Sequence, residues 1–148
     1  MFGSLNEKGI EHVLKYQLVG RIGCHADNKT YIVPICYAYE ENCIYGRTFE
    51  GLKVNMMREN PKVCFQIENL EGMGKWQSVI CWGEFEELTD NIKRNKGIEI
   101  LQNRVSAIIG DKNLRVSRHW PFSQGSENTE GIIFCIHIRE KTGKFENI

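Results

Sequence analysis

The feature that most constrains the fold is a succession of strand-like segments separated by short polar turns. Segment Leu18–His25 is followed by a turn at 27–29 and then by Thr30–Tyr39, the pattern of a β-hairpin. A second turn leads to Cys43–Tyr45, and Lys62–Glu68 alternates apolar and polar residues as a strand with one buried face does. The sequence therefore predicts a mainly β protein.

Two later segments extend this sheet and suggest its curvature. Trp76–Leu88 is long enough to be a full strand, and Gly83 within it indicates a bulge or bend. Ile132–Ile138 alternates isoleucine and phenylalanine with other residues and is expected to be the last strand. Six mostly antiparallel strands with a strong bend predict a small Greek-key barrel.

Helices are expected at three places. Leu5–Tyr16 has weak amphipathic spacing, and a short helix is expected to follow the third strand and end before Pro61. A longer helix is predicted from a cap at Thr89-Asp90 to about Ile109, with Gly110 as its stop. Residues 111–130 are polar and irregular, so the long helix precedes the last strand.

Length and composition narrow the classes of function. The 148 residues are expected to form a single domain, 1–148, and the 19 basic and 19 acidic residues cancel. This balance argues against a nucleic-acid or membrane partner. Because the N-terminus lacks the pattern of a signal peptide and no apolar run is long enough to span a bilayer, a cytoplasmic protein is expected.

Cysteines and histidines are scattered along the chain. The six cysteines form no C-x-x-C pair and lie mostly in apolar strand-like runs, so reduced core thiols are expected in place of disulfides. The four histidines are equally dispersed, and no metal site is expected from this spacing. The cysteines are Cys24, Cys36, Cys43, Cys64, Cys81 and Cys135, and the histidines are His12, His25, His119 and His137.

The stretch Tyr45–Pro61, YGRTFEGLKVNMMRENP, has the composition of an anion-binding junction between a strand and a helix. Free N–H groups and the dipole at a helix start attract anions, and Thr48 is the expected N-cap. Gly51 would let a ligand approach the backbone, while Arg47 and Lys53 would bring positive charge to a phosphate. An ordinary capped helix with two solvated cations is the open alternative.

Pro34 interrupts an otherwise convincing strand. Proline cannot donate a ladder hydrogen bond and is confined to edges, bulges and strand starts. A strand held open at this point would leave backbone groups of Val33 and Ile35 free for a ligand. A plain edge-strand proline is the alternative explanation.

Three segments in one order carry a resemblance to a known family. They are VPI at Val33–Ile35, YGRTFEGLK followed by Asn60-Pro61, and WQSVICWGEFEEL at Trp76–Leu88. Together they resemble the pyridoxamine 5′-phosphate oxidase-like superfamily of FMN-binding split barrels, and most of all its nitroimidazole-resistance branch. The likeness covers about residues 17–88 and, more faintly, the last strand up to Lys144. It implies a split form of the six-stranded antiparallel Greek-key barrel.

The resemblance also implies a cofactor and a site. The strand at Val33, Pro34 and Ile35 would lie against the isoalloxazine ring of FMN through main-chain contacts. Family members are typically homodimers with flavin between the subunits. The remaining implied contacts are with the phosphate and ribityl chain, or come from the partner: Arg47, Thr48, Gly51, Lys53, Gln77, Ser78 and Val79, with Trp120 or His119 reaching the ring from the partner.

Departures from the family pattern limit the expected activity. Nitroimidazole-resistance relatives tend to carry histidine where this chain has Arg47, and the arginine-rich ending of true pyridoxamine 5′-phosphate oxidases is missing. We therefore expect an FMN-dependent oxidoreductase that passes hydride from a reduced nicotinamide to a small acceptor, with its catalytic side chains unassigned. A non-enzymatic flavin carrier, a haem-binding split barrel and a deazaflavin in place of FMN remain open alternatives.

Overall fold

In the computed structural model, eight antiparallel strands and three helices account for most of the described chain, residues 1–108 and 129–148. The predicted mainly β class is confirmed. The elements are β1 (Phe2–Ser4), α1 (Glu7–Tyr16), β2 (Val19–Ala26), β3 (Lys29–Cys36), β4 (Ala38–Glu40), β5 (Cys43–Thr48), α2 (Leu52–Glu59), β6 (Lys62–Gly72), β7 (Lys75–Glu87), α3 (Asn91–Ile108) and β8 (Ile132–Asn147).

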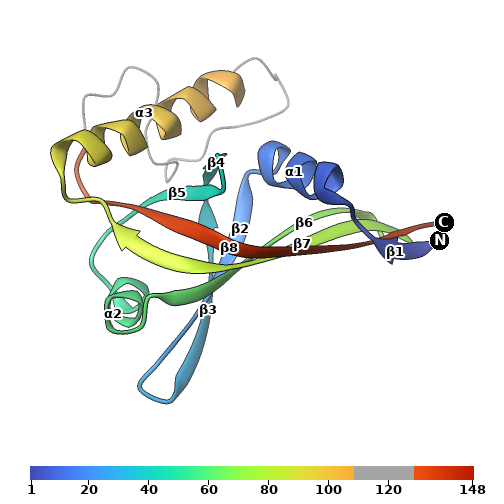
Figure 1. Cartoon of the computed structure of the whole chain (residues 1–148), viewed down its shortest axis with the longest axis horizontal. Helices are drawn as coiled ribbons and strands as arrows, with labels where there is room; N and C mark the ends of the chain where they lie inside the picture. The colour runs from blue at the N-terminus through green and yellow to red at the C-terminus, as the bar shows by residue number, and fades with distance from the viewer. Residues whose placement is uncertain (109–128) are drawn as a thin grey trace.

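The strands form one strongly bent, open sheet in the order β3-β2-β6-β7-β8-β5-β4 (Figure 1). β8 is the longest described strand and pairs with β7 from Phe134 to Asn147. Its other edge is shared, because β5 pairs with its first half and β1 with its last residues. The path does not close, which agrees with the split barrel that the family resemblance implies.

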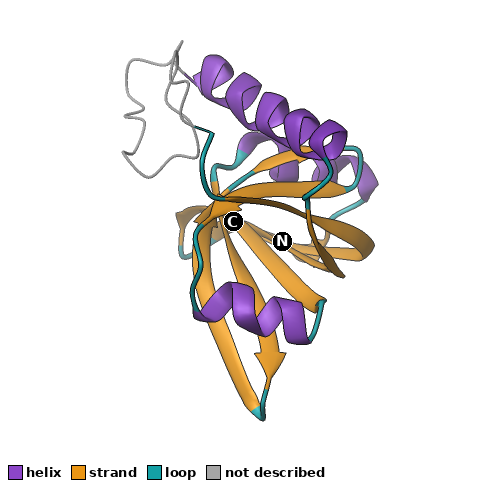
Figure 2. Ribbon diagram, turned by 90° about the vertical axis from the view of Figure 1, so that its left-hand side faces the viewer, coloured by secondary structure: helices purple, strands orange, loops and turns teal. Residues whose placement is uncertain are grey.

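Two cores lie on opposite sides of the wall formed by β5 and β8, since neighbouring residues of a strand face opposite ways. The larger core includes Ile44 and Phe134, and α1 and α2 both contribute side chains to it. The smaller core includes Tyr45 and Cys135 and is covered by Ile98 and Leu101 of α3. In Figure 2, α3 is the long helix at the top of the sheet and α2 is the separate short helix near the bottom.

Several predicted local features are confirmed. The hairpin turn between β2 and β3 has positive φ angles at Asp27 and Asn28, as a primed turn requires. Asp90 Oδ2 accepts a hydrogen bond from Lys93 N at 3.2 Å and caps the start of α3. The register of β7 and β8 shifts between Trp82 and Gly83, so the predicted bulge is present.

Glycine is required at position 83 because the bulge leaves no room for a Cβ atom. A Cβ placed on Gly83 would lie 2.2 Å from the carbonyl oxygen of His137, on the neighbouring strand. The clash of a Cβ with a backbone carbonyl cannot be relieved by rotating a side chain. Glycine therefore allows the two strands to stay paired where the sheet bends.

The number and length of strands differ from the prediction of six. The predicted segment 30–39 divides at Tyr37 into β3, which pairs with β2, and β4, which pairs with β5. The Tyr37 hydroxyl donates to the Leu14 carbonyl at 2.8 Å at this change of partner. The last strand continues to Asn147, beyond the predicted end at Ile138. Its polar second half pairs with β7, and residues 144–146 pair with β1 as well, so hydrogen bonding and not apolar alternation defines it.

In the described part of the chain, no helix is both long and apolar enough to cross a membrane. The expected helix stop Gly110, and His119 and Trp120, lie outside the described residues.

Candidate functional site

The N-terminus of α2 begins at Gly51, not at the predicted cap Thr48. Thr48 is the last residue of β5, paired with Ile132, and its hydroxyl donates weakly to the carbonyl of Phe49 at 3.4 Å. Three residues separate it from the first helical turn, so its side chain does not cap the helix. The prediction of Thr48 as N-cap is therefore wrong.

The first turn of α2 consequently has no side-chain cap. The first helical bond runs from Asn55 N to the Gly51 carbonyl at 3.1 Å, and the N–H groups before Asn55 precede the helical ladder. Gly51 is exposed, and no atom lies within 4 Å of the position that its Cβ would occupy. Open space thus meets donor groups and the positive end of the helix dipole at one point.

Lys53 adds a full positive charge to the first turn of α2. Its side chain is half-buried and faces Cys24 of β2, against which α2 packs. Within the described part of the chain it forms no hydrogen bond or ion pair. Burial lowers the pKa of Lys53, with partial compensation from Cys24. A cation held partly out of water without a counter-ion is suited to receive an anion.

Arg47 faces a different region. It shares a face of β5 with Tyr45, toward α3, and its Nε donates to the Glu130 carbonyl at 2.5 Å. Its guanidinium also lies 5.2 Å from the ring centre of Phe49. Burial lowers the pKa of Arg47, while Glu130 partly restores it. The structure therefore separates the two cations that the sequence places in one junction.

A third cation, Arg58, which sequence analysis did not single out, holds the junction in place. Arg58 near the end of α2 donates two hydrogen bonds to Glu50, at 2.8 and 2.9 Å, and two to Glu87 at the end of β7, at the same two distances. These contacts tie the residue before Gly51 to both α2 and the sheet. The i, i+8 spacing of Glu50 and Arg58 gives no helical pairing signal, so only the fold reveals this clamp.

The strand with Val33, Pro34 and Ile35 is β3, at one edge of the sheet. Tyr37 N donates to Leu18 O, and antiparallel pairs alternate between bonded and unbonded, so Val33 and Ile35 turn their backbone groups toward β2. The expectation that these groups stay free is wrong within one chain. The backbone of Pro34 instead faces the edge of β3 away from β2, where no other strand of the described chain pairs. The missing N–H of proline therefore costs no ladder hydrogen bond.

Gln77, Ser78 and Val79 do not approach α2 within one chain. They pair with Ile67–Asn69 of β6 and with residues 143–145 of β8, at the end of the sheet where both termini lie. Figure 1 shows α2 at the opposite end of the long axis. Val79 is fully buried, while Ser78 accepts a hydrogen bond from Gln66 at 3.1 Å.

Replacing Gly51 by valine should leave folding nearly intact and weaken anion binding. The open space accommodates the side chain, and a poor N-cap costs about 1 kcal/mol of unfolding free energy. If the expected flavin phosphate lies at this helix start, loss of close approach should reduce flavin affinity by about 1–3 kcal/mol, the range for a lost charge-assisted hydrogen bond. Titration of flavin-stripped protein measures this.

Asn95→Val is the matched control, because Asn95 is an exposed, uncharged residue of α3, away from α2 and from the end of the sheet that holds the termini. It should bind flavin as the unmodified protein does. Equal affinity of the two valine variants would remove Gly51 from the site.

The fold and this site define a split-barrel protein with an uncapped, cation-lined helix start at one end of its sheet. The model of the pyridoxamine 5′-phosphate oxidase family matches residues 6–144, and the chain belongs to this family.

Three known proteins resemble the chain in sequence or in fold. An uncharacterised protein of Rhizobium meliloti (strain 1021) is 40% identical over 70 residues, which span 47% of this chain and 46% of that protein. An FAD-binding protein of Mesorhizobium loti is 27% identical with a TM-score of 0.76, over 99% of both chains. A Bacteroides thetaiotaomicron protein named for 5-nitroimidazole antibiotic resistance has a TM-score of 0.72 at 17% identity, over 98% of this chain and 87% of that one.

Proposed function

We propose that the protein is an FMN-binding oxidoreductase whose site for the flavin phosphate is the start of α2. The half-buried ammonium of Lys53, which pairs with no residue of the described chain, lies beside the uncapped first turn, and this observation carries the proposal. The Mesorhizobium loti relative is named as an FAD-binding protein, which supports flavin binding by this chain. Among the described residues, one cation at one helix start matches the single phosphate of FMN better than a pyrophosphate.

The residues of the junction would bind and orient the cofactor and would not react. Backbone N–H groups after Gly51 and the ammonium of Lys53 would hold the phosphate, and the clamp of Arg58 on Glu50 would keep this geometry fixed. When bound, FMN supplies hydride transfer from a reduced nicotinamide to a small acceptor. The open edge of β3 at Pro34 would border the ring.

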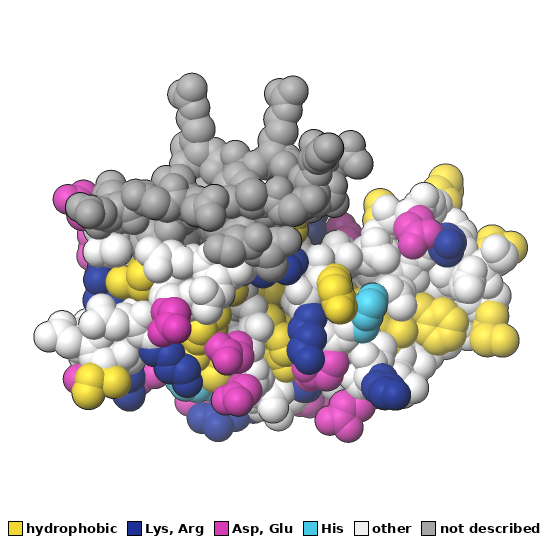
Figure 3. Space-filling model, turned by 90° about the horizontal axis from the view of Figure 1, so that it is seen from above, with side chains coloured by type: hydrophobic (Ala, Val, Ile, Leu, Met, Phe, Trp, Pro, Cys, Tyr) yellow, Lys and Arg dark blue, Asp and Glu magenta, His cyan; other side chains and the backbone are white. Residues whose placement is uncertain are grey.

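The wide separation of Gln77 and Ser78 from Lys53 leads us to propose a homodimer. One flavin can contact both groups only if they come from different chains. Hydrophobic side chains gather at the end of the molecule that holds the termini and the β6–β7 turn (Figure 3), where Met73 is 97% and Phe2 66% exposed. Docking of this apolar end on a second copy would cover it and bring Gln77 to the partner's α2.

Co-expression of two variants that each bind FMN weakly tests whether the site is shared between two chains. Lys53→Met and Gln77→Ala chains, each weak in FMN binding alone, should recover tight binding when they are co-expressed. A mixed dimer contains one site with both defects and one intact site, so about one site per mixed dimer should bind FMN. Absence of recovery, with a dimer shown by light scattering, would place both groups in one chain or remove Gln77 from the site.

FMN affinity should decline at alkaline pH, because Lys53 binds phosphate only as the ammonium. Burial lowers the pKa of Lys53, so charge is lost at lower pH than for an ordinary lysine, and a bound phosphate opposes that loss. Affinity should be constant below the pKa of the free protein and fall by up to about tenfold per pH unit above it. Lys53→Arg should remove the decline, and an unchanged decline would assign it to another group.

Reduction assays separate enzyme from carrier. The purified protein should carry a flavin spectrum that NADH or NADPH bleaches without oxygen and that a nitroaromatic or quinone acceptor restores. A flavin spectrum without bleaching would favour the carrier, and a Soret band would favour haem. Mass spectrometry of the extracted cofactor distinguishes FMN from FAD and deazaflavin.

A further inference from the structure

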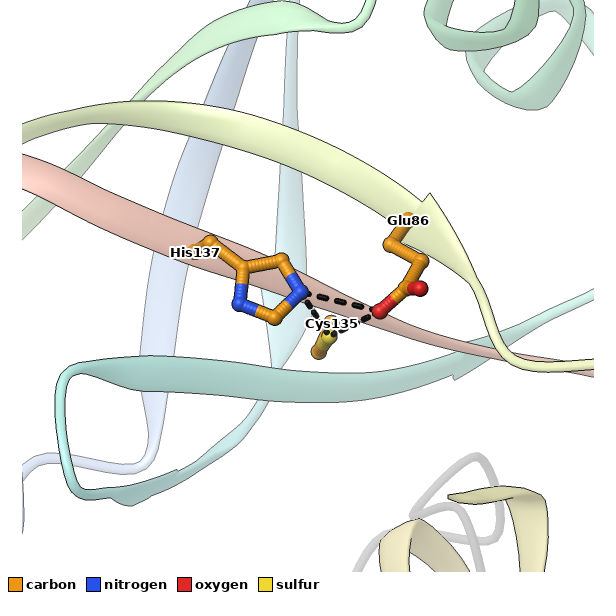
Figure 4. Close-up of side chains that lie close together, drawn as sticks. All are labelled: Glu86, Cys135 and His137. Atoms are coloured by element: carbon orange, nitrogen blue, oxygen red, sulfur yellow. Dashed lines mark hydrogen bonds and ion pairs between the residues drawn. The ribbon is translucent and has the colours of Figure 1, made fainter.

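Three side chains with metal-binding atoms meet on neighbouring strands at the rim of the smaller core. Glu86 of β7 lies directly opposite Cys135 of β8, and His137 follows two residues later on the same face. Figure 4 shows the carboxylate, the thiol and the imidazole pointing toward one another. Their positions 86, 135 and 137 become neighbours only through strand pairing, so sequence spacing does not reveal the group.

The distances between the three ligand atoms approach those of a zinc site. His137 Nε2 lies 2.9 Å from Glu86 Oε1 and 3.2 Å from Cys135 Sγ, and Cys135 Sγ lies 3.7 Å from Glu86 Oε1. Ideal zinc bond lengths in a tetrahedron separate such atoms by about 3.4–3.6 Å. Each pair is within about half an ångström of this separation, so small side-chain rotations would complete the geometry.

We propose that Glu86, Cys135 and His137 bind a zinc ion as three protein ligands with a fourth position open to solvent. Thiolate, imidazole and carboxylate together suit Zn²⁺, whereas Mg²⁺ and Ca²⁺ prefer oxygen ligands alone. The side chains of His137 and Glu86 are 39% and 36% exposed, which gives an ion a path from solvent. Cys135 is 2% exposed and anchors the site to the core.

The surroundings orient these ligands. Cys43 Sγ lies 3.6 Å from His137 Nδ1, and Lys93 Nζ pairs with Glu86 Oε2 at 3.2 Å, leaving Oε1 for the ion. Zinc binding releases the Cys135 thiol proton to solvent and places the imidazole proton on Nδ1, where Cys43 accepts it. The zinc site is separate from the proposed flavin site. Cys135 packs in the smaller core, whereas Cys24, which Lys53 faces, packs in the larger core.

Metal content and affinity of the full-length protein test the site. Isothermal titration with Zn²⁺ should give one site per chain. Co²⁺ should give the visible absorption bands of a tetrahedral thiolate complex, at wavelengths longer than those of flavin. His137→Gln and Cys135→Ser should weaken Zn²⁺ by more than roughly 100-fold, since changes to partners outside the ligand set alone cost roughly 10–100-fold. His25→Gln and Cys64→Ser should bind Zn²⁺ normally.

Cys43→Ala supplies a second test that leaves the three ligands in place. It should weaken Zn²⁺ by roughly 10–100-fold without abolishing the cobalt spectrum. Flavin content and thermal unfolding without metal should remain near those of the unmodified protein in His137→Gln, which separates this site from the flavin site. Absence of a tetrahedral cobalt spectrum in the unmodified protein, or equal Zn²⁺ affinity in His137→Gln and His25→Gln, would overturn the proposal.

Discussion

Lys53→Met is expected to release FMN from the protein while leaving the fold in place. Methionine keeps the length and apolar contacts of the lysine stem beside Cys24 but removes the ammonium. A lost charge-assisted hydrogen bond to phosphate should cost about 1–3 kcal/mol of binding free energy, or roughly five- to 150-fold in Kd. Fluorescence quenching of FMN by flavin-stripped protein measures the change.

Lys96→Met provides the matched control for charge. Lys96 is an exposed lysine of α3, which lies away from α2 (Figure 2). Its loss should change FMN affinity only through weak screened charge. The flavin-free Lys53→Met protein should unfold at or above the temperature of the unmodified protein, since the change removes a half-buried cation that no described residue pairs with. Equal affinity of the two variants would exclude Lys53 from phosphate binding.

Phe65→Ala should produce the largest loss of stability. Phe65 is fully buried in the larger core, with its ring centre 5.1 Å from that of Tyr37 in an edge-to-face contact. Truncation of such a residue costs about 3–5 kcal/mol of unfolding free energy. Urea unfolding at a fixed chain concentration, with and without FMN, measures it.

Gly20→Ala should couple strongly to Phe65→Ala. A Cβ on Gly20 would lie 2.2 Å from Cζ of Phe65, so the single change is expected to cost about 1–3 kcal/mol through overpacking. Removing the ring creates space for that methyl group, and the double variant should be more stable than the sum of the two costs by about 0.5–3 kcal/mol. Additive costs would mean that Gly20 is not held against Phe65.

Local patterns predicted most of the fold correctly. The turn at Asp27 and Asn28, the bulge at Gly83 and the helix start at Asp90 each depend on neighbouring residues, which a sequence displays. The second half of β8 and the short β1 depend on pairing between chain ends, which no local pattern encodes. For this reason the predicted last strand ended too early.

The candidate site was predictable only where its residues are adjacent in sequence. The junction with Gly51 and Lys53 is a continuous segment, so its composition already indicated a candidate anion site. The capping role given to Thr48 was wrong because the exact helix start depends on where β5 stops pairing. The Arg58 clamp and the group around His137 join distant segments, and both required the three-dimensional structure.

The central claim, that the start of α2 binds a flavin phosphate, is tested most directly by comparing FMN with riboflavin. The two ligands share the ring and ribityl chain and differ only in the phosphate. Flavin-stripped protein should bind one FMN per chain, and bind riboflavin more weakly by at least the effect of Lys53→Met, about 1–3 kcal/mol. Lys53→Met should narrow that difference. Equal affinity for FMN and riboflavin in the unmodified protein would contradict the account.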